Sequence, residues 1–116
     1  MHELSIAASI VDIVDEAVES RGQGRVAVVH LKLGAMAGVV EDALLFSFEV
    51  AAAGTSVEGA RLDIEMVPVT VCCPDCRVER TLALRQPLRC PECGTPTPKV
   101  VGGSELEVIA VEVEDD

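Results

Sequence analysis

Two cysteine pairs decide how part of this chain folds: Cys73-Pro74-Asp75-Cys76 and, thirteen residues later, Cys90-Pro91-Glu92-Cys93-Gly94. Each Cys-x-x-Cys pair bends into a tight turn that points two thiolates at one centre, and two facing turns build a tetrahedral four-sulfur site. Such a site suits Zn²⁺. Because four thiolates leave no open ligand position, we expect the zinc to be structural rather than catalytic. The two prolines stiffen the turns, and the glycine eases the exit from the second one.

Other interpretations of the cysteines fit the chain less well. Two disulfides need an oxidising compartment, and we expect no export because no basic leader region opens the sequence. A thioredoxin-like motif needs one pair at the start of a helix rather than two pairs beside prolines. The fifth cysteine, Cys72, is an alternative to Cys73 as a ligand, although the two-residue spacing to Cys76 favours Cys73.

Length and composition limit the remaining possibilities. The chain has 116 residues, enough for one compact domain and a small module. It has two phenylalanines and no tryptophan or tyrosine, so its core must be aliphatic. Nine basic and twenty acidic residues give a net charge of −11, which argues against binding to nucleic acid. No apolar run is long enough to predict a transmembrane helix, and we expect a cytoplasmic protein.

Hydrophobic periodicity predicts an α/β fold with an inserted module. Helices are expected over 4–20 and 41–53, with a loop over 34–40, and strands over 25–33, 60–71 and 106–113. The simplest arrangement is a small three-stranded sheet covered on one face by two helices, with a zinc ribbon inserted. The predicted domains are 1–70 with 101–116, and 71–100. Gly102 and Gly103 are expected to form a flexible joint, and Pro68 to mark where full strand pairing stops.

The same patterns predict which side chains face the core. The first helix should bury a stripe of Ala7, Ile10, Val11, Val14, Ala17 and Val18. The second should bury Leu44, Leu45, Phe48 and Ala52. The first strand should bury Val29, Leu31 and Leu33 and turn His30 and Lys32 to its polar face. We expect His30 to be exposed or hydrogen-bonded there, with no functional role.

The N-terminus is a second candidate metal site, whereas enzyme motifs are absent. The sequence contains no phosphate-binding loop and no dinucleotide fingerprint. It starts Met1-His2-Glu3. The α-amine of Met1, the backbone nitrogen of His2 and the imidazole of His2 can close chelate rings around one ion, and Glu3 adds a carboxylate nearby. Nitrogen-rich coordination of this kind favours Ni²⁺ or Cu²⁺.

Taken together, these features resemble the HypA/HybF family of hydrogenase nickel-incorporation proteins. The resemblance covers the whole chain and rests on Met1-His2-Glu3, the helix starting Leu4-Ser5-Ile6-Ala7-Ala8-Ser9, Leu33-Gly34-Ala35, Phe48-Glu49, the two cysteine pairs and Gly103-Ser104-Glu105-Leu106. It implies a nickel metallochaperone, not an enzyme, that binds nickel through Met1, His2 and Glu3 and zinc through Cys73, Cys76, Cys90 and Cys93. It also implies two partners, the GTPase HypB and the precursor of the NiFe-hydrogenase large subunit; some members also serve urease.

One position departs from the family pattern. Some relatives carry an acidic residue near Val40 that is implicated in nickel binding, and here the side chain is apolar. A contribution from this region must come from Glu41 or Asp42, or be absent. Two alternative functions stay open at this point: a zinc-ribbon adaptor in which His2 is incidental, and a metal-dependent hydrolase that uses His2, Glu3 and further acids.

Overall fold

The computed structural model describes residues 2–22, 24–82, 87–97 and 99–114. The chain forms two compact units, each built from segments that are distant in the sequence. The first unit comprises Met1–Leu31, Val39–Ile64 and Val108–Asp116, and the second comprises Lys32–Gly38 and Glu65–Glu107. The domain limits expected from the sequence, 1–70 with 101–116 and 71–100, stay a prediction.

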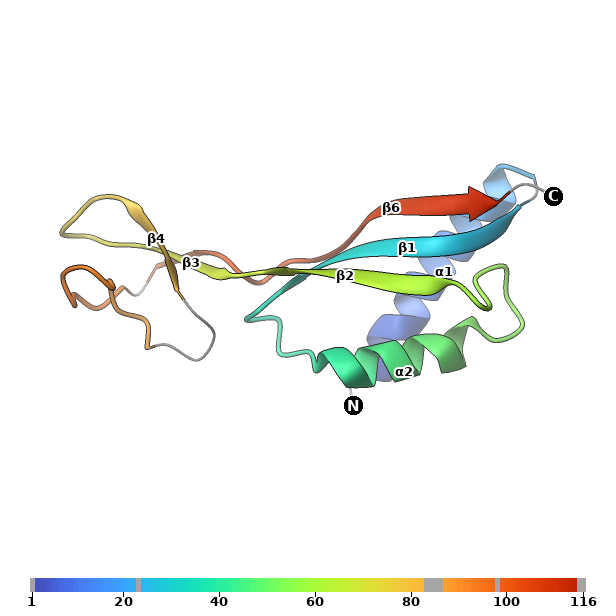
Figure 1. The fold of residues 1–116 in the computed structure, drawn as a ribbon, viewed down its shortest axis with the longest axis horizontal. Helices are drawn as coiled ribbons and strands as arrows, with labels where there is room; N and C mark the ends of the chain where they lie inside the picture. The colour runs from blue at the N-terminus through green and yellow to red at the C-terminus, as the bar shows by residue number, and fades with distance from the viewer. Residues whose placement is uncertain (1, 23, 83–86, 98, 115–116) are drawn as a thin grey trace. The chain divides into compact units, whose positions relative to one another are not determined.

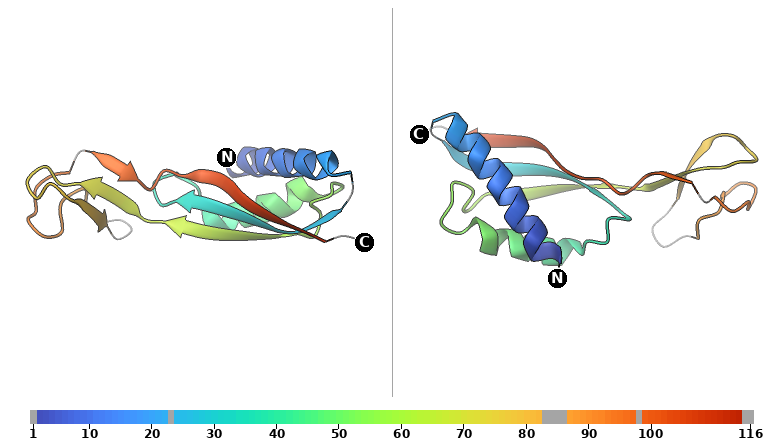
Figure 2. Two further views of the ribbon diagram at one scale, coloured as in Figure 1. Left: turned by 90° about the horizontal axis from the view of Figure 1, so that it is seen from above. Right: turned by 180° about the vertical axis from the view of Figure 1, so that it is seen from behind.

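One sheet has three strands in the order β2-β1-β6. These strands are β1 Arg25–Gly34, β2 Arg61–Val67 and β6 Leu106–Glu114. β1 and β2 run the same way and β6 runs back, as their colours and arrowheads show (Figures 1 and 2). Both helices lie on one face of this sheet (Figure 2). The predicted α/β architecture, a three-stranded sheet with two helices, is therefore confirmed.

The first helix, α1, spans His2–Ser20 and begins two residues earlier than predicted. Its core stripe is buried as expected except at one position, because Ala17 is exposed. The buried members are Ala7, Ile10, Val11, Val14 and Val18. They recur at three- and four-residue steps and so fall on one side of the helix. The central strand β1 buries Val29, Leu31 and Leu33 completely.

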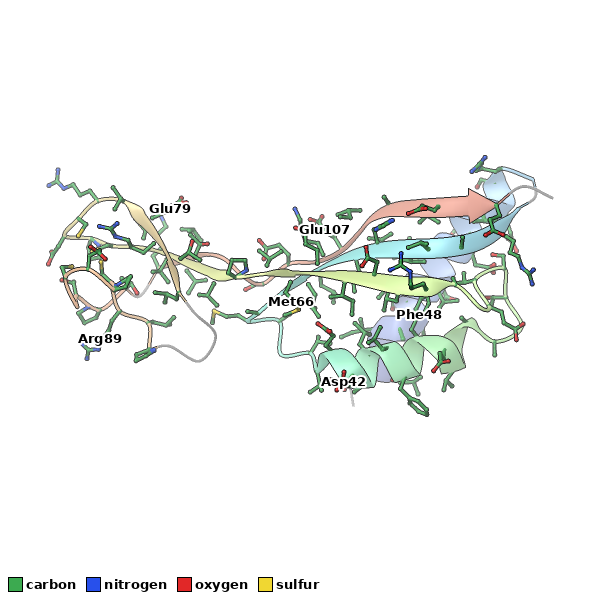
Figure 3. The ribbon with its side chains drawn as sticks, viewed as in Figure 1. Asp42, Phe48, Met66, Glu79, Arg89 and Glu107 are labelled. Carbon is green, nitrogen blue, oxygen red and sulfur yellow. The ribbon has the colours of Figure 1, made fainter. Side chains whose placement is uncertain are left out.

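The second helix, α2, spans Glu41–Ala52 and packs against α1. Leu44, Phe48 and Ala52 are buried, as predicted, and Phe48 lies between α2 and the sheet (Figure 3). The prediction for Leu45 was wrong, because 36% of this residue is exposed. Apolar side chains occupy several sides of α2, so periodicity alone does not identify the side that packs.

The second unit has a small sheet of its own, which the sequence did not predict. It consists of β3 Val69–Cys72, β4 Glu79–Leu82 and β5 Val100–Gly102, in the order β4-β3-β5 with antiparallel pairing. The single strand expected over 60–71 is divided at Pro68 into β2 and β3, as the missing N–H of proline favours. Val69, Val71 and Leu82 form the core of this sheet.

The two glycines expected to form a flexible joint are instead part of the packed second unit. Gly102 ends β5, and Gly103 is buried at a φ of +114° that favours glycine. The carbonyl of Gly103 accepts a hydrogen bond from the Met36 N–H at 2.6 Å. A β-carbon on Gly34 would collide with that same carbonyl and lie 2.6 Å from the Glu105 nitrogen. The backbones approach too closely here for any larger residue at position 34.

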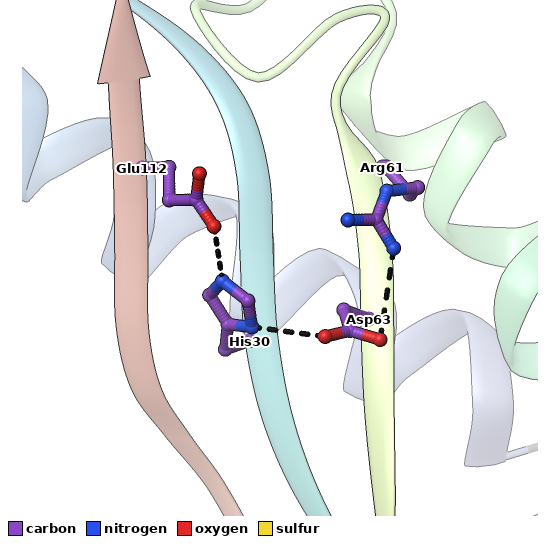
Figure 4. Close-up of polar contacts among 4 residues, drawn as sticks. All are labelled: His30, Arg61, Asp63 and Glu112. Carbon is purple, nitrogen blue, oxygen red and sulfur yellow. Dashed lines mark hydrogen bonds and ion pairs between the residues drawn. The ribbon is translucent and has the colours of Figure 1, made fainter.

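The polar face of the larger sheet carries a cluster centred on His30 of β1 (Figure 4). Nδ1 of His30 lies 3.0 Å from Asp63 on β2, and Nε2 lies 2.6 Å from Glu112 on β6. Arg61 reaches Asp63 at 3.6 Å. Carboxylates only accept hydrogen bonds, so Asp63 and Glu112 stabilise the protonated imidazole, in which both ring nitrogens donate. The hydrogen bond to Glu112 contributes most to raising the pKa of His30; burial opposes it and Asp63 adds to it.

Candidate metal centre

The first cysteine pair sits in a turn closed by backbone hydrogen bonds. The N–H of Arg77 donates to the Cys73 carbonyl at 2.8 Å, and the N–H of Cys73 donates to the Val78 carbonyl at 3.0 Å. The Cys76 N–H points at the Cys73 sulfur, at 3.3 Å. Arg77 has a φ of +59°, which makes it the only described residue other than glycine with a positive φ. The residue after the second cysteine must adopt this conformation for the turn to close.

The second pair repeats this pattern. The N–H of Gly94 donates to the Cys90 carbonyl at 2.8 Å, and the N–H of Cys90 donates to the Thr95 carbonyl at 2.9 Å. Gly94 has a φ of +76° and stands where Arg77 stands in the first turn. Here glycine meets the same backbone requirement without the strain that a β-carbon creates.

The two turns bring four sulfurs together. The Sγ atoms of Cys73, Cys76, Cys90 and Cys93 all lie within 4.8 Å of one another. Two of the separations are 3.5 Å, between Cys73 and Cys93, and 3.9 Å, between Cys76 and Cys90. Four sulfurs in a regular tetrahedron about 2.3 Å from a zinc ion would be about 3.8 Å apart. The donor set and its spacing therefore fit a tetrahedral Zn²⁺ site.

Burial and hydrogen bonding differ among the four thiols. Cys73 and Cys90 are buried, whereas Cys93 is exposed and lies 3.2 Å from the Thr95 hydroxyl, which donates to Asp75 at 2.7 Å. The N–H of Cys93 contributes most to lowering the pKa of Cys90 to about 6, against its burial. At Cys73 the Cys76 N–H lowers the pKa, but burial and the nearby Cys93 thiol raise it to about 11. A divalent cation would stabilise all four as thiolates.

Cys72, the alternative ligand, lies outside this group. It ends β3, where its N–H donates to the Lys99 carbonyl at 3.1 Å and its Cα pairs with Glu79 of β4. Successive residues of a strand point to opposite faces, so a side chain at position 72 and one at position 73 are directed differently. The structure brings Cys73, and not Cys72, to the other three sulfurs.

The N-terminal residues are only partly within the described chain. Met1 lies outside it, and of His2 the structure describes the backbone, which starts α1. Glu3 accepts a hydrogen bond from the Val40 N–H at 3.1 Å, and this bond contributes most to lowering the pKa of Glu3. Glu41 and Asp42 begin α2 and are exposed.

Sequence reasoning missed the contact between Glu3 and Val40. Val40 is the N-cap of α2 and offers no side-chain cap of its own. Helix N-termini attract negative charge, and an apolar N-cap leaves its first amides in need of an acceptor from elsewhere. An apolar residue directly before a helix with an acidic first turn therefore indicated that an acceptor from elsewhere in the chain binds this helix start. It did not identify Glu3 as that acceptor.

Comparison with known proteins agrees with this arrangement. The model of a family described as "Hydrogenase/urease nickel incorporation, metallochaperone, hypA" matches residues 1–113. The chain belongs to the HypA family. A HypA hydrogenase maturation factor of Roseiflexus sp. (strain RS-1) is 53% identical over 116 residues, covering all of this chain and 94% of the relative. Another from Chloroflexus aurantiacus is 54% identical over 112 residues, covering 97% of this chain and 98% of the relative.

Two solved HypA structures share the fold. The solution structure of the nickel metallochaperone HypA from Helicobacter pylori matches with a TM-score of 0.66 and 18% identity, covering 98% of each chain. A second HypA solution structure matches with a TM-score of 0.69 and 21% identity, covering 98% of this chain and 97% of that one. At such identities the likeness concerns the fold alone. No helix in the described part of the chain is long and apolar enough to cross a membrane.

Proposed function

We propose that this chain is a nickel metallochaperone that binds Ni²⁺ at its N-terminus and delivers it for maturation of a NiFe-hydrogenase. Membership of the HypA family, whose model matches residues 1–113, is the observation that carries this proposal. The relatives' name, hydrogenase maturation factor, supports a hydrogenase as the client. The protein is then a carrier and not an enzyme.

Zinc is the resident metal in this proposal, held by Cys73, Cys76, Cys90 and Cys93. The grouping of the four sulfurs and their near-tetrahedral spacing support it. Four thiolates complete the coordination shell of Zn²⁺, so the ion has no position for a substrate. Its role is to hold the second unit together, because the metal-binding free energy of such sites contributes directly to folding.

Nickel is the cargo, bound through Met1, His2 and Glu3. The α-amine has a pKa near 8 and can lose its proton to a metal at neutral pH. The backbone nitrogen and imidazole of His2 complete the chelate. A carboxylate has several acceptor sites, so Glu3 can accept the Val40 N–H and still reach an ion. Few ligands near the start of a chain are easily replaced, which suits transfer to a partner.

Two partners belong to the proposal: the GTPase HypB and the precursor of the hydrogenase large subunit. Nickel transfer requires a partner that completes the coordination shell of the ion while the N-terminal ligands dissociate from it. The family's description as a nickel-incorporation metallochaperone supports such a transfer. The expected cytoplasmic location stays a prediction.

The test compares two histidine variants, since His2 and His30 are the only histidines in the sequence. His2→Ala should abolish specific nickel binding in calorimetry and leave one zinc per chain by elemental analysis. His30→Gln is the matched control and should keep both metals. Nickel binding that survives in His2→Ala would refute the N-terminal site, and loss of nickel in His30→Gln would move the site to the sheet.

A further inference from the structure

The helix α2 has two apolar sides, and only one of them is used by the core. Leu44, Phe48 and Ala52 are buried. On another side Phe46 is 68% exposed and Val50 is 53% exposed. These two residues are four positions apart and are therefore neighbours on the helix surface. Phe46 is one of only two aromatic residues in the sequence, and it faces solvent.

The exposed stripe extends toward the start of the helix. Leu45 is 36% exposed, and Val40, directly before α2, is 61% exposed. The N–H of Val40 is the group that holds the Glu3 carboxylate. The α2 face, defined as Val40, Asp42, Leu45, Phe46, Glu49 and Val50, therefore begins at a residue that contacts a proposed nickel ligand.

The charges of the α2 face all have one sign. Asp42 precedes Phe46 by four positions and Glu49 precedes Val50 by one, and both are exposed. The helix contains no lysine or arginine, and the whole chain carries −11. An apolar stripe with an aromatic anchor and a charged rim is typical of a protein interface. Opposite charges on the two partners favour association and like charges oppose it.

We propose that the α2 face binds a protein partner that presents apolar side chains within a basic rim, and that this partner is the GTPase that handles nickel. The choice of partner rests on the proposed function and on the position of the face beside Glu3, where a docked protein would reach the N-terminal ligands. A second copy of the chain is disfavoured because acidic rims would meet. An anionic membrane surface is disfavoured for the same reason.

The experiment measures binding of the purified GTPase to the full-length, zinc-loaded chain by calorimetry. Phe46→Ser should weaken binding by about tenfold or more, as for an aromatic anchor. Ile13→Ser is the matched control, since Ile13 is equally apolar, 59% exposed and on α1; its affinity should stay within about twofold of wild type. Circular dichroism and zinc content establish that both variants are folded.

Charge reversal tests the basic rim. Glu49→Lys should weaken binding, and added salt should weaken binding of the wild type because it screens the attraction. Glu19→Lys, an equal change of charge at an exposed position of α1, should have a smaller effect. Equal effects at positions 49 and 19 would show that only net charge matters and would overturn the proposed rim.

The remaining outcomes separate this proposal from the proposed function. If wild type binds the GTPase and Phe46→Ser binds equally well, the docking surface is wrong and the chaperone function stands. If wild type does not bind the GTPase, docking and partner both fail, while nickel binding by His2 is judged separately. Sedimentation that shows a dimer of wild type and a monomer of Phe46→Ser would assign the face to a second copy. Specific binding to vesicles containing anionic lipid would assign it to a membrane.

Discussion

The two proposed metal sites differ in how much of the chain holds them. The cysteine centre is assembled by two turns with matching backbone hydrogen bonds, and two of its four thiols are buried. The N-terminal site draws on the first three residues, and in the described part of the chain the Val40 N–H anchors the Glu3 carboxylate. A site held from many directions retains its ion, whereas a site at the end of a chain can open. The difference matches a resident metal and a transferred one.

Among the tests of this difference between the two metal sites, removing one cysteine sulfur should have the largest effect. Cys73→Ala should lose about one zinc per chain and unfold the second unit, because a remaining set of three thiols cannot complete the site. The first unit should keep its structure, since its core is built from α1, α2 and β1. Elemental analysis and amide NMR spectra would measure both effects.

The neighbouring cysteine provides the control for that experiment. Cys72→Ala should keep full zinc content, since Cys72 lies outside the sulfur group. Loss of zinc in Cys72→Ala with retention in Cys73→Ala would reverse the ligand assignment. Collapse of both units in Cys73→Ala would contradict the independence of the first unit.

Extension of the N-terminus should weaken only the proposed nickel site and leave the cysteine centre unchanged. A Gly-Ser dipeptide before Met1 converts the α-amine into an amide and leaves the side chains of His2 and Glu3 unchanged. Nickel affinity should fall sharply, while zinc content and folding stay as in wild type because the added residues are exposed. Calorimetry on chains with and without the dipeptide is the measurement. Equal affinities would mean that His2 works with other side chains, such as Glu41 or Asp42.

The two turns of the cysteine centre can be compared by substituting the residue with a positive φ in each turn. Gly94→Ala should weaken zinc binding by about 1–2 kcal/mol through backbone strain alone, because its β-carbon would meet no atom within 4 Å. Arg77→Gly should relieve such strain and strengthen binding by a smaller amount, because glycine also gains freedom in the unfolded chain. Competition with a chromogenic chelator gives both affinities. Opposite signs from those expected would show that the turns are not equivalent.

The smallest expected effect concerns His30, which lies in the first unit. Since the folded-state pKa of His30 is raised, its contribution to stability is complete below the unfolded pKa, about 6.5, and is lost as pH rises through the folded value. The urea midpoint of the first unit should therefore fall with rising pH in wild type. His30→Gln should reduce this pH dependence. An unchanged slope in the variant would contradict the stabilising role of protonated His30.

Local features of this chain were predictable from the sequence. The Cys-x-x-Cys spacing predicted the grouping of Cys73, Cys76, Cys90 and Cys93, because each pair needs only its own turn to orient two sulfurs. The core stripe of α1, apart from the exposed Ala17, and the buried positions of β1 followed from simple periodicities. Pro68 predicted the end of strand pairing because it lacks an N–H.

Features that depend on distant contacts were not predictable in this way. Leu45 belongs to a helix whose apolar residues lie on several sides, and only packing against α1 and the sheet selects one. Gly103 resembles a hinge in sequence, but it is fixed by the Met36 N–H and by the close approach of Gly34. The bond from Val40 to Glu3 joins residues 37 positions apart, so no short motif contains both.

Each cysteine turn is closed by its own pair of backbone hydrogen bonds, so each forms as a half-site without the other. Turns of this size close in less than a microsecond, much faster than a sheet forms. An ion bound by one cysteine pair needs only the second pair to complete its coordination. The entropic cost of closing the segment between the two pairs grows slowly with its length. At the proposed zinc site, the ion would therefore act as the folding nucleus of the second unit, and its supply would set when a newly synthesised chain matures.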